Sequence, residues 1–431
     1  MYFRHLLLCT NLSLPLLFSP LLQAGTAAAS PPEPEPHPHS FFQEHFRFSL
    51  ITTAAFGGST ADPAELAVGA HDPRQEWANL QTVEGVLGFE FDPYLDGSVV
   101  AVGYLDEDDQ IDGEIEEAYA RIKGIPGGFT LKGGRFLAEF GRTNRQHLHQ
   151  WSFADYALAH GRFLGEHGLQ GDGAQVSWLL PLPIYSELFL GVLSVPEDDH
   201  NHGGEAHHEE HGDEEHSGAH ALEGHDANIR DRAFAARWAL SHDLTDTQTL
   251  TGGISYAIGE NGFGDSRETQ VFGADLYYRW KPAQTERGFP FVSWHTGVLY
   301  RTVEAMAEEE EEHGDHEEHG HEDAHGHHEE EASHEPARRL LDLDEIGVHS
   351  EVNWGFRTNW VAGLRAEWVS GIDEFGEEGR ERWRVSPALT WYLKEHTHLR
   401  VQYNLDRGEG TGTDHSVKPI CARKRVWRSR L

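Results

Sequence analysis

Apolar and polar residues alternate with a period of two along most of the chain after Phe46. Residues 399–405 read LRVQYNL, with Leu, Val, Tyr and Leu on one set of positions and Arg, Gln and Asn on the other. Residues 360–368 and 383–391 repeat this pattern. Because successive side chains of a β-strand point to opposite faces of the sheet, the period predicts strands with one apolar and one polar face.

Charged residues on the polar faces decide between a soluble β-sandwich and a membrane barrel, since either fold would show the alternation. Charges of both signs occur in the middle of the expected strands, where a water-filled lumen accommodates them while lipid takes the apolar face. Tryptophan and tyrosine lie near strand ends, as in the aromatic girdles of membrane barrels, although strands of any kind favour aromatic residues. The charged positions are Glu90, Arg237, Asp275, Arg279, Glu351, Arg365 and Glu367, and the aromatic positions are Trp178, Tyr256, Trp280, Tyr300, Trp354, Trp360, Trp368 and Trp391. The sequence therefore favours a transmembrane antiparallel β-barrel.

Connections between the expected strands are alternately short and long, which is typical of barrels with short periplasmic turns and long external loops. The longest connections are 58–78, 142–169, 196–229 and 305–341. The expected strands are 46–57, 79–92, 97–106, 113–123, 129–141, 170–180, 184–195, 230–241, 247–258, 268–280, 289–304, 342–356, 359–371, 381–393 and 397–406, with a further strand after Asp414. This pattern predicts one all-β domain over 46–417, a barrel of about 16 strands that is wide enough for an aqueous channel.

Composition limits the partners and the compartment. The 431 residues carry a net charge of -38, which argues against a nucleic-acid partner. Cys9 and Cys421 are the only cysteines. Because Cys9 lies in a segment that we expect to be removed, we expect neither an internal disulfide nor a cysteine-rich metal site.

Residues 1–29 have the features of a signal peptide. Arg4 and His5 precede an apolar run over 6–22, and three alanines at 27–29 offer a cleavage site. The apolar run is too interrupted for a membrane anchor. Residues 30–45, rich in Pro, His and Glu, are expected to form an extended tether.

Two segments, 196–229 and 305–341, are rich in histidine interspersed with Asp and Glu. Imidazole and carboxylate ligands suit zinc, copper, nickel and iron, and a dense acidic tract concentrates cations. The irregular spacing implies several interchangeable weak sites, whose binding would weaken below about pH 6.5 as histidines protonate. The alternative is a solvated acidic loop that binds no metal. The candidate ligands are His200, His202, His207, His208, His211, His216, His220, His225, His313, His316, His319, His321, His325, His327, His328 and His334. We expect both segments on the external side, at the mouth of the channel.

A smaller candidate is the pair His147 and His149 in the long connection after Phe140. The H-x-H spacing can supply two metal ligands, and a long porin loop can fold inward to narrow the channel. An exposed or packed pair without metal is an equally good interpretation. His295 and His349 lie on polar strand faces and are expected to be ordinary lumen residues. No arrangement of side chains supports catalysis, so we expect no enzymatic activity.

Residues 116–190 carry a resemblance to a known family, most clearly in GRFLAEFG at 134–141 and LPLP at 180–183. The stretch resembles bacterial zinc-regulated TonB-dependent outer membrane receptors, which are similar to phosphate-selective porins, and the resemblance extends over roughly 46–417. It implies an outer-membrane barrel, zinc-linked regulation and uptake of zinc or a zinc complex, with no catalytic residues. TonB-dependent transporters have 22 strands and a folded plug, whereas this length supports about sixteen strands, so we expect the porin-like form.

Residues 418–431 depart from the strand pattern. The segment is abruptly basic, breaks the alternation and ends in Leu431, so that it resembles an out-of-frame terminus. A barrel without its last strand would expose an unpaired edge to lipid, which is costly.

The leading functional hypothesis is a channel or receptor that collects zinc or another divalent metal at its external loops and admits it to the periplasm. The alternative is a barrel that buffers metal at the cell surface without transport. No cofactor is required, and the divalent metal is the expected ligand or substrate. The expected partners are outer-membrane lipid, the barrel-assembly machinery and, by analogy with porins, two further copies in a homotrimer.

Overall fold

The computed structural model describes residues 41–74, 77–105, 111–196, 224–264, 266–308, 338–375, 379–408 and 413–427. The signal peptide expected at 1–29 lies outside the described residues. So do all the candidate ligands of the two histidine-rich segments except His225. The barrel lies within one compact unit, Phe42–Leu431.

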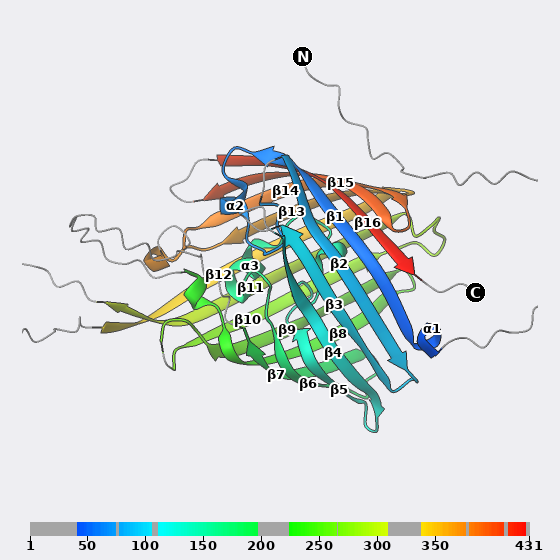
Figure 1. Ribbon diagram of the computed structural model, residues 1–431, viewed down its shortest axis with the longest axis horizontal. Helices are drawn as coiled ribbons and strands as arrows, with labels where there is room; N and C mark the ends of the chain where they lie inside the picture. The colour runs from blue at the N-terminus through cyan, green and yellow to red at the C-terminus, as the bar shows by residue number, and fades with distance from the viewer. Residues whose placement is uncertain are drawn as a thin grey trace, which may run out of the picture. The chain divides into compact units, whose positions relative to one another are not determined.

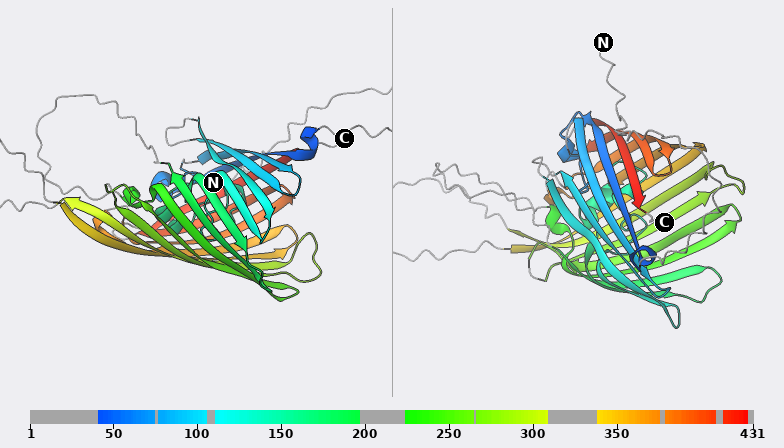
Figure 2. Two further views of the ribbon diagram at one scale, coloured as in Figure 1. Left: turned by 90° about the horizontal axis from the view of Figure 1, so that it is seen from below. Right: turned by 45° about the vertical axis from the view of Figure 1, so that its right-hand side comes forward.

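Within the described residues, sixteen antiparallel strands form one closed barrel (Figures 1 and 2). Each strand pairs with its neighbours in the sequence, and the first strand pairs with the last. The strands are β1 (Phe46–Ser59), β2 (Trp77–Phe91), β3 (Leu95–Leu105), β4 (Ile111–Ile125), β5 (Phe129–Leu137), β6 (Gln170–Leu179), β7 (Tyr185–Val195), β8 (Arg230–Thr245), β9 (Gln248–Glu260), β10 (Glu268–Trp280), β11 (Phe291–Glu308), β12 (Arg338–Arg357), β13 (Trp360–Val369), β14 (Arg382–Lys394), β15 (Thr397–Gly408) and β16 (Thr413–Trp427). The predicted all-β barrel is confirmed.

Helical segments in the described residues are short. They are α1 (Phe41–His45), α2 (Pro63–Leu66), α3 (Leu158–Leu164) and the 3-10 turns η1 (Leu148–Gln150), η2 (Gly224–Ala227) and η3 (Asp373–Phe375). Helix α1 occupies the end of the segment expected to be an extended tether, so that expectation is wrong for Phe41–His45. None of the described helices is long and apolar enough to cross a membrane.

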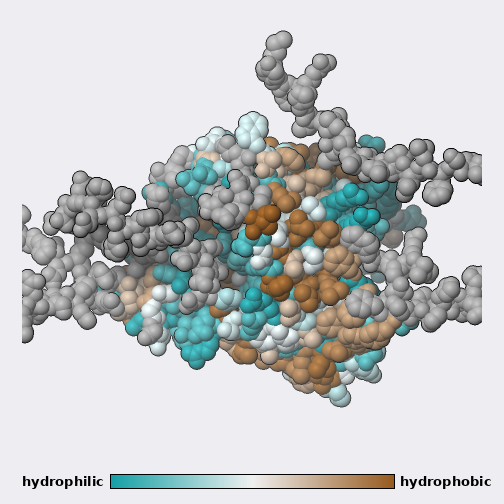
Figure 3. Space-filling view, in the orientation of Figure 1, coloured by the Kyte–Doolittle hydropathy of each residue, from teal (hydrophilic) through white to brown (hydrophobic). Residues whose placement is uncertain are grey.

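The strands present their apolar faces outward and their polar faces inward. On β15, Val401 is 52% exposed while Gln402 and Asn404 are fully buried. On β13, Leu364 is 52% exposed while Arg365 is 3% exposed. Exposed apolar side chains gather over the strands that face the viewer in Figure 3. This arrangement reverses that of a soluble protein and suits a barrel whose outer face meets hydrocarbon.

The closing strand corrects the boundary drawn at Val417. Strand β16 runs to Trp427 and pairs with β15 on one side and β1 on the other. The basic residues fit this strand because Lys418 is buried in the lumen against Asp155, while Arg423 and Arg425 lie near the end where the short turns are. The barrel therefore has no open edge between β1 and β16, and only 428–431 of the tail lie outside the described residues.

Candidate metal site in the barrel lumen

The connection between β5 and β6, residues 138–169, crosses the interior of the barrel; we call it the inner loop. Its backbone N–H groups donate hydrogen bonds to inward-facing side chains of distant strands, in three pairs: Gly141 to Ser255 Oγ (3.0 Å), Ala154 to Gln402 Oε1 (2.7 Å) and Leu158 to Glu367 Oε1 (3.0 Å). Helix α3 of this loop packs against β11, β12 and β13 (Figure 1). The expectation that a long loop folds inward therefore agrees with the structure.

Two cavities lie on opposite sides of the inner loop. A cavity of about 650 Å³ opens among the long connections and is lined in part by Leu66, Arg74 and Glu166. A cavity of about 260 Å³ opens among the short turns and is lined in part by His149 and Glu395. In barrels of this class the long connections are external and the short turns periplasmic, so we call these the external and periplasmic cavities.

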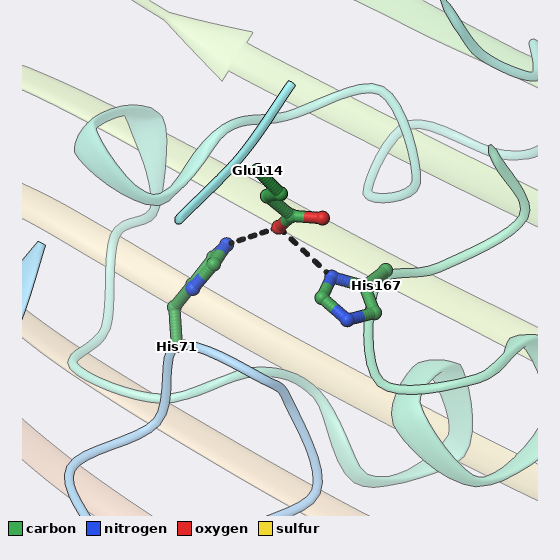
Figure 4. Close-up of side chains that lie close together, drawn as sticks. All are labelled: His71, Glu114 and His167. Carbon is green, nitrogen blue, oxygen red and sulfur yellow. Dashed lines mark ion pairs between the residues drawn. The ribbon is translucent and has the colours of Figure 1, made fainter. Parts of the chain in front are cut away.

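Three potential metal ligands converge beside the external cavity. His71 follows α2, Glu114 lies near the external end of β4, and His167 lies near the end of the inner loop. Their ligand atoms all lie within 4.8 Å of one another. Figure 4 shows the Glu114 carboxylate between the two imidazoles, with Oε1 at 3.3 Å from His71 Nε2 and 3.0 Å from His167 Nδ1.

The geometry of this group fits a cation better than a hydrogen-bond network. His71 Nε2, Glu114 Oε1 and His167 Nδ1 are buried and make no well-directed hydrogen bond within the described residues, although they stand at ion-pair distance. Tetrahedral zinc holds its ligand atoms at about 2.0–2.1 Å, which places neighbouring ligand atoms roughly 3.3 Å apart. The two nitrogen–oxygen distances are close to that spacing. Two imidazoles and one carboxylate also form a ligand set that zinc and other borderline divalent metals accept.

A β-bulge in β4 extends the group toward the middle of the barrel. The pairing of β3 with β4 shifts between Val100 and Ala101, so that Glu116 has no partner in the register. Neighbouring residues of a regular strand face opposite sides, but the bulge turns both Glu116 and Glu117 into the lumen, where each is 8% exposed. They accept hydrogen bonds from the two ring nitrogens of His147, at 2.8 Å from Nδ1 and 3.0 Å from Nε2.

Electrostatics favour positive charge in this part of the lumen. Burial alone would lower the pKa of His71, but Glu114 and Glu116 outweigh it and raise the pKa to about 10. Burial likewise opposes the charge on His147, and its two glutamates raise its pKa to about 10. The pKa of His167 is also raised, against burial, by Glu114. The carboxylates thus stabilise cations strongly, whether protons on imidazole or a metal ion.

The structure places the two inner-loop candidates together. His147 and His149 flank Leu148, and their rings lie parallel with centroids 6.0 Å apart. His149 Nδ1 lies 2.6 Å from Glu84 Oε2 on β2. Both side chains thus lie inside the lumen in contact with glutamate carboxylates. Metal binding by His147 and His149 stays a prediction.

His225 is the one candidate of the histidine-rich segments that the structure describes. It lies on η2 at the wall of the external cavity, with Nε2 at 3.7 Å from Asp226 Oδ1. His295 and His349, expected to be lumen residues, are buried inside the barrel beside His160 of α3.

The wall of the lumen formed by β13 to β16 is basic. Arg365, Arg384 and Lys418, from β13, β14 and β16, surround Asp155 of the inner loop. Arg384 Nε also donates to Asp406 Oδ1 at 2.7 Å. Arg365, Arg384 and Lys418 therefore hold the inner loop through Asp155.

Sequence reasoning missed His71, Glu114, Glu116, Glu117 and His167, because they come from three separate segments and form no local motif. The available signal was Glu114 and Glu116 on the polar face of one expected strand, with Ile115 between them on the lipid side. Ile115 is indeed 42% exposed.

Comparison with known proteins supports the fold. No protein-family model matches the sequence. An uncharacterized protein of Aquifex aeolicus (strain VF5) is 36% identical over 212 residues, which cover 46% of this chain and 40% of that protein, so the chain spans less than half of its length.

Solved structures resemble the whole barrel. The outer membrane channel DcaP of Acinetobacter baumannii is similar with a TM-score of 0.52 and 11% identity, over 88% of this chain and 96% of that one. OmpF of Salmonella typhi, in a complex with daunomycin, is similar with a TM-score of 0.50 and 9% identity, over 88% and 97%. Together with the apolar outer face and polar interior, these similarities identify a porin-like β-barrel of the bacterial outer membrane.

Proposed function

We propose that this protein is an outer-membrane channel that admits divalent metal ions, zinc above all, to the periplasm. The observation that carries the proposal is the convergence of His71, Glu114 and His167 near the external end of β4, beside Glu166 on the wall of the external cavity. A ligand group at this place meets ions that have entered the barrel. A channel for uncharged solutes gains nothing from it.

The ligand set supports zinc over the harder cations. Magnesium and calcium prefer sites made of oxygen atoms, whereas two imidazole nitrogens favour zinc, copper, nickel and iron. The resemblance to zinc-regulated receptors, noted in residues 116–190, points in the same direction. The histidine-rich segments 196–229 and 305–341 would raise the local metal concentration at the channel mouth.

The metal is cargo in this proposal, so binding in the lumen must be strong enough for entry and weak enough for release. The lumen group offers three protein ligands and no thiolate, which suits reversible binding better than a four-ligand structural site. The homotrimer, the assembly machinery and the zinc-linked regulation stay predictions.

The proposal is tested with the refolded protein in liposomes that contain a zinc-sensitive fluorophore. Zinc added outside should enter faster than into protein-free liposomes, and the double variant H71A/H167A should lower the rate at least tenfold. The matched control is H242A, which removes an exposed histidine on β8. Zinc entry no faster than in protein-free liposomes, or an undiminished rate in the double variant, would overturn the proposal.

The surface-buffer alternative predicts a different result in the same liposomes. Such a barrel binds zinc but does not let it enter. Zinc binding by the refolded protein without influx would therefore favour the buffer.

A further inference from the structure

Carboxylate and imidazole groups alternate from the external cavity into the inner loop. Glu166 lines the external cavity, and its Oε1 lies 3.6 Å from His167 Nε2. His167 shares Glu114 with His71. His71 Nε2 then lies 3.5 Å from Glu116 Oε1, the first carboxylate of the β4 bulge. Glu116 therefore adds a further carboxylate next to the group of His71, Glu114 and His167.

The series continues to the periplasmic cavity, with two imidazoles in succession. His147 stands between Glu116 and Glu117 and stacks beside His149, in the longest step of the series at 6.0 Å between ring centroids. His149 contacts Glu84 and lines the periplasmic cavity. The series thus spans the inner loop from one cavity to the other.

We propose that metal ions cross the inner loop along this series by stepwise ligand exchange, with the loop itself staying in place. The inference rests on the proposed function and names its route. We call the series from Glu166 to Glu84 the exchange path.

Ligand exchange needs each new ligand within reach before the previous one leaves. Every contact in the exchange path except the step from His147 to His149 joins ligand atoms 2.6–3.6 Å apart. These separations are near or below the roughly 3.3 Å between ligand atoms around one zinc ion, so both atoms of each contact can bind the same ion. At His167 and His147 the ion must also pass from one ring nitrogen to the other, because the two contacts of each imidazole are made by different nitrogens. Since zinc has no d-electron preference for geometry, its coordination can change at each step at little cost.

The exchange path is favoured over the other wall of the lumen by charge. The wall formed by β13 to β16 presents Arg365, Arg384 and Lys418, which would repel a divalent cation, and their carboxylate partners Asp155 and Asp406 already hold them. On the exchange path, two of the five carboxylates also have a basic neighbour: Arg74 pairs with Glu166, and Lys132 lies 3.8 Å from Glu117. A hinged opening of the whole inner loop would have to break the buried contacts of Asp155 with β13, β14 and β16. Passage along the exchange path breaks none of them.

The test separates the inner half of the exchange path from the metal group at its external end. Zinc influx into liposomes and zinc binding by titration calorimetry are measured for wild type, H147Q and H149Q. The matched control is H398Q, because His398 lies on the wall of the periplasmic cavity but contacts Tyr392 instead of the exchange path. The heat-modifiable mobility of folded barrels on gels establishes folding. H149Q removes one side-chain contact and serves if H147Q fails to fold.

The exchange path predicts that H147Q and H149Q each lower zinc influx at least tenfold, while the external metal group still binds zinc with an affinity within threefold of wild type. H398Q should change neither quantity more than twofold. Influx of the folded inner variants within twofold of wild type would overturn the exchange path and leave the proposed function intact. Absence of influx in wild type would overturn the proposed function itself.

Discussion

Lys418 of β16 donates a hydrogen bond from Nζ to Asp155 Oδ2 of the inner loop, at 3.1 Å. Arg365 also donates to Asp155, and Gln402 Nε2 and Asn404 Nδ2 donate to it at 2.8 and 2.6 Å. With Arg384 of β14, which also pairs with Asp155, one carboxylate on the inner loop is thus held by four strands, β13 to β16. Lys418, the first residue of the segment 418–431 that departs from the strand pattern, is thus one of the partners of Asp155.

Replacing Asp155 by asparagine should loosen the inner loop. The change keeps the shape of the side chain but leaves buried cations without their counter-charge, and breaking a buried pair in this way costs about 3–5 kcal/mol. We expect single-channel conductance in potassium chloride to rise at least twofold and the inner loop to become accessible to protease. The control D246N changes an exposed turn residue. Wild-type conductance and protease resistance in D155N would show that Asp155 does not anchor the loop.

Zinc binding should release protons. Without metal, His71 and His147 have a pKa of about 10 and carry protons at neutral pH, so zinc must displace them to reach the ring nitrogens. The affinity should therefore rise with pH from 7 toward 10. Calorimetry in two buffers of different ionisation enthalpy measures the protons released, about one for each histidine that binds. A pH-independent affinity over this range would contradict the assignment.

Acid should weaken the packing of α3. His160 is buried, and burial together with His349, His295 and Arg365 holds its pKa well below the usual 6.5. Because the packed state disfavours the charged ring, its stability is constant above about pH 6.5 and falls as pH drops below that value. Protection of the inner loop from protease should decrease between pH 7 and pH 5 in wild type. The variant H160Q should show a smaller pH dependence, whatever its stability at pH 7, while His295 and His349 remain buried beside the site.

The barrel could be predicted closely from the sequence, whereas the lumen site could not. Each strand carries its own signal, because lipid and water select opposite residue types at alternate positions, as at Leu364 and Arg365. The site depends on which inward residues meet across the lumen. Which residues meet depends on the path of the inner loop and on the bulge at Glu116, and neither feature produces a periodic pattern in the sequence. The pair His147 and His149 was visible only because two histidines lie close in the sequence.

The outward face of β13 offers a test of the membrane orientation. Leu364 stands in the middle of this strand, exposed on the outer side. Leu364→Arg should destabilise the barrel in lipid vesicles by about 2–4 kcal/mol, the cost of a charged side chain at mid-membrane, and Leu364→Ala should cost much less. Urea unfolding followed by tryptophan fluorescence measures both. Equal stabilities of the two variants would place this face outside the hydrocarbon.

The histidine-rich segments should affect capture more than permeation. Removing 197–223 and 309–337 takes out fifteen of the sixteen candidate loop histidines but none of the described lumen ligands. We expect the number of zinc ions bound per chain to fall several-fold. Influx at saturating zinc should stay within twofold of wild type, and influx at low zinc should drop. A loss of influx at saturating zinc would give these segments a role in the passage itself.

Because β1 pairs with β16, the wall of the channel is closed by the first and the last strand in the sequence. The backbone N–H and C=O groups along one edge of each strand have their hydrogen-bond partners on the other strand, so the pairing of β1 with β16 closes the barrel. Loss of Thr413–Trp427 would therefore open the barrel, because β1 and β15 would each expose an unpaired edge to hydrocarbon. The inner loop would at the same time lose its contact with Lys418.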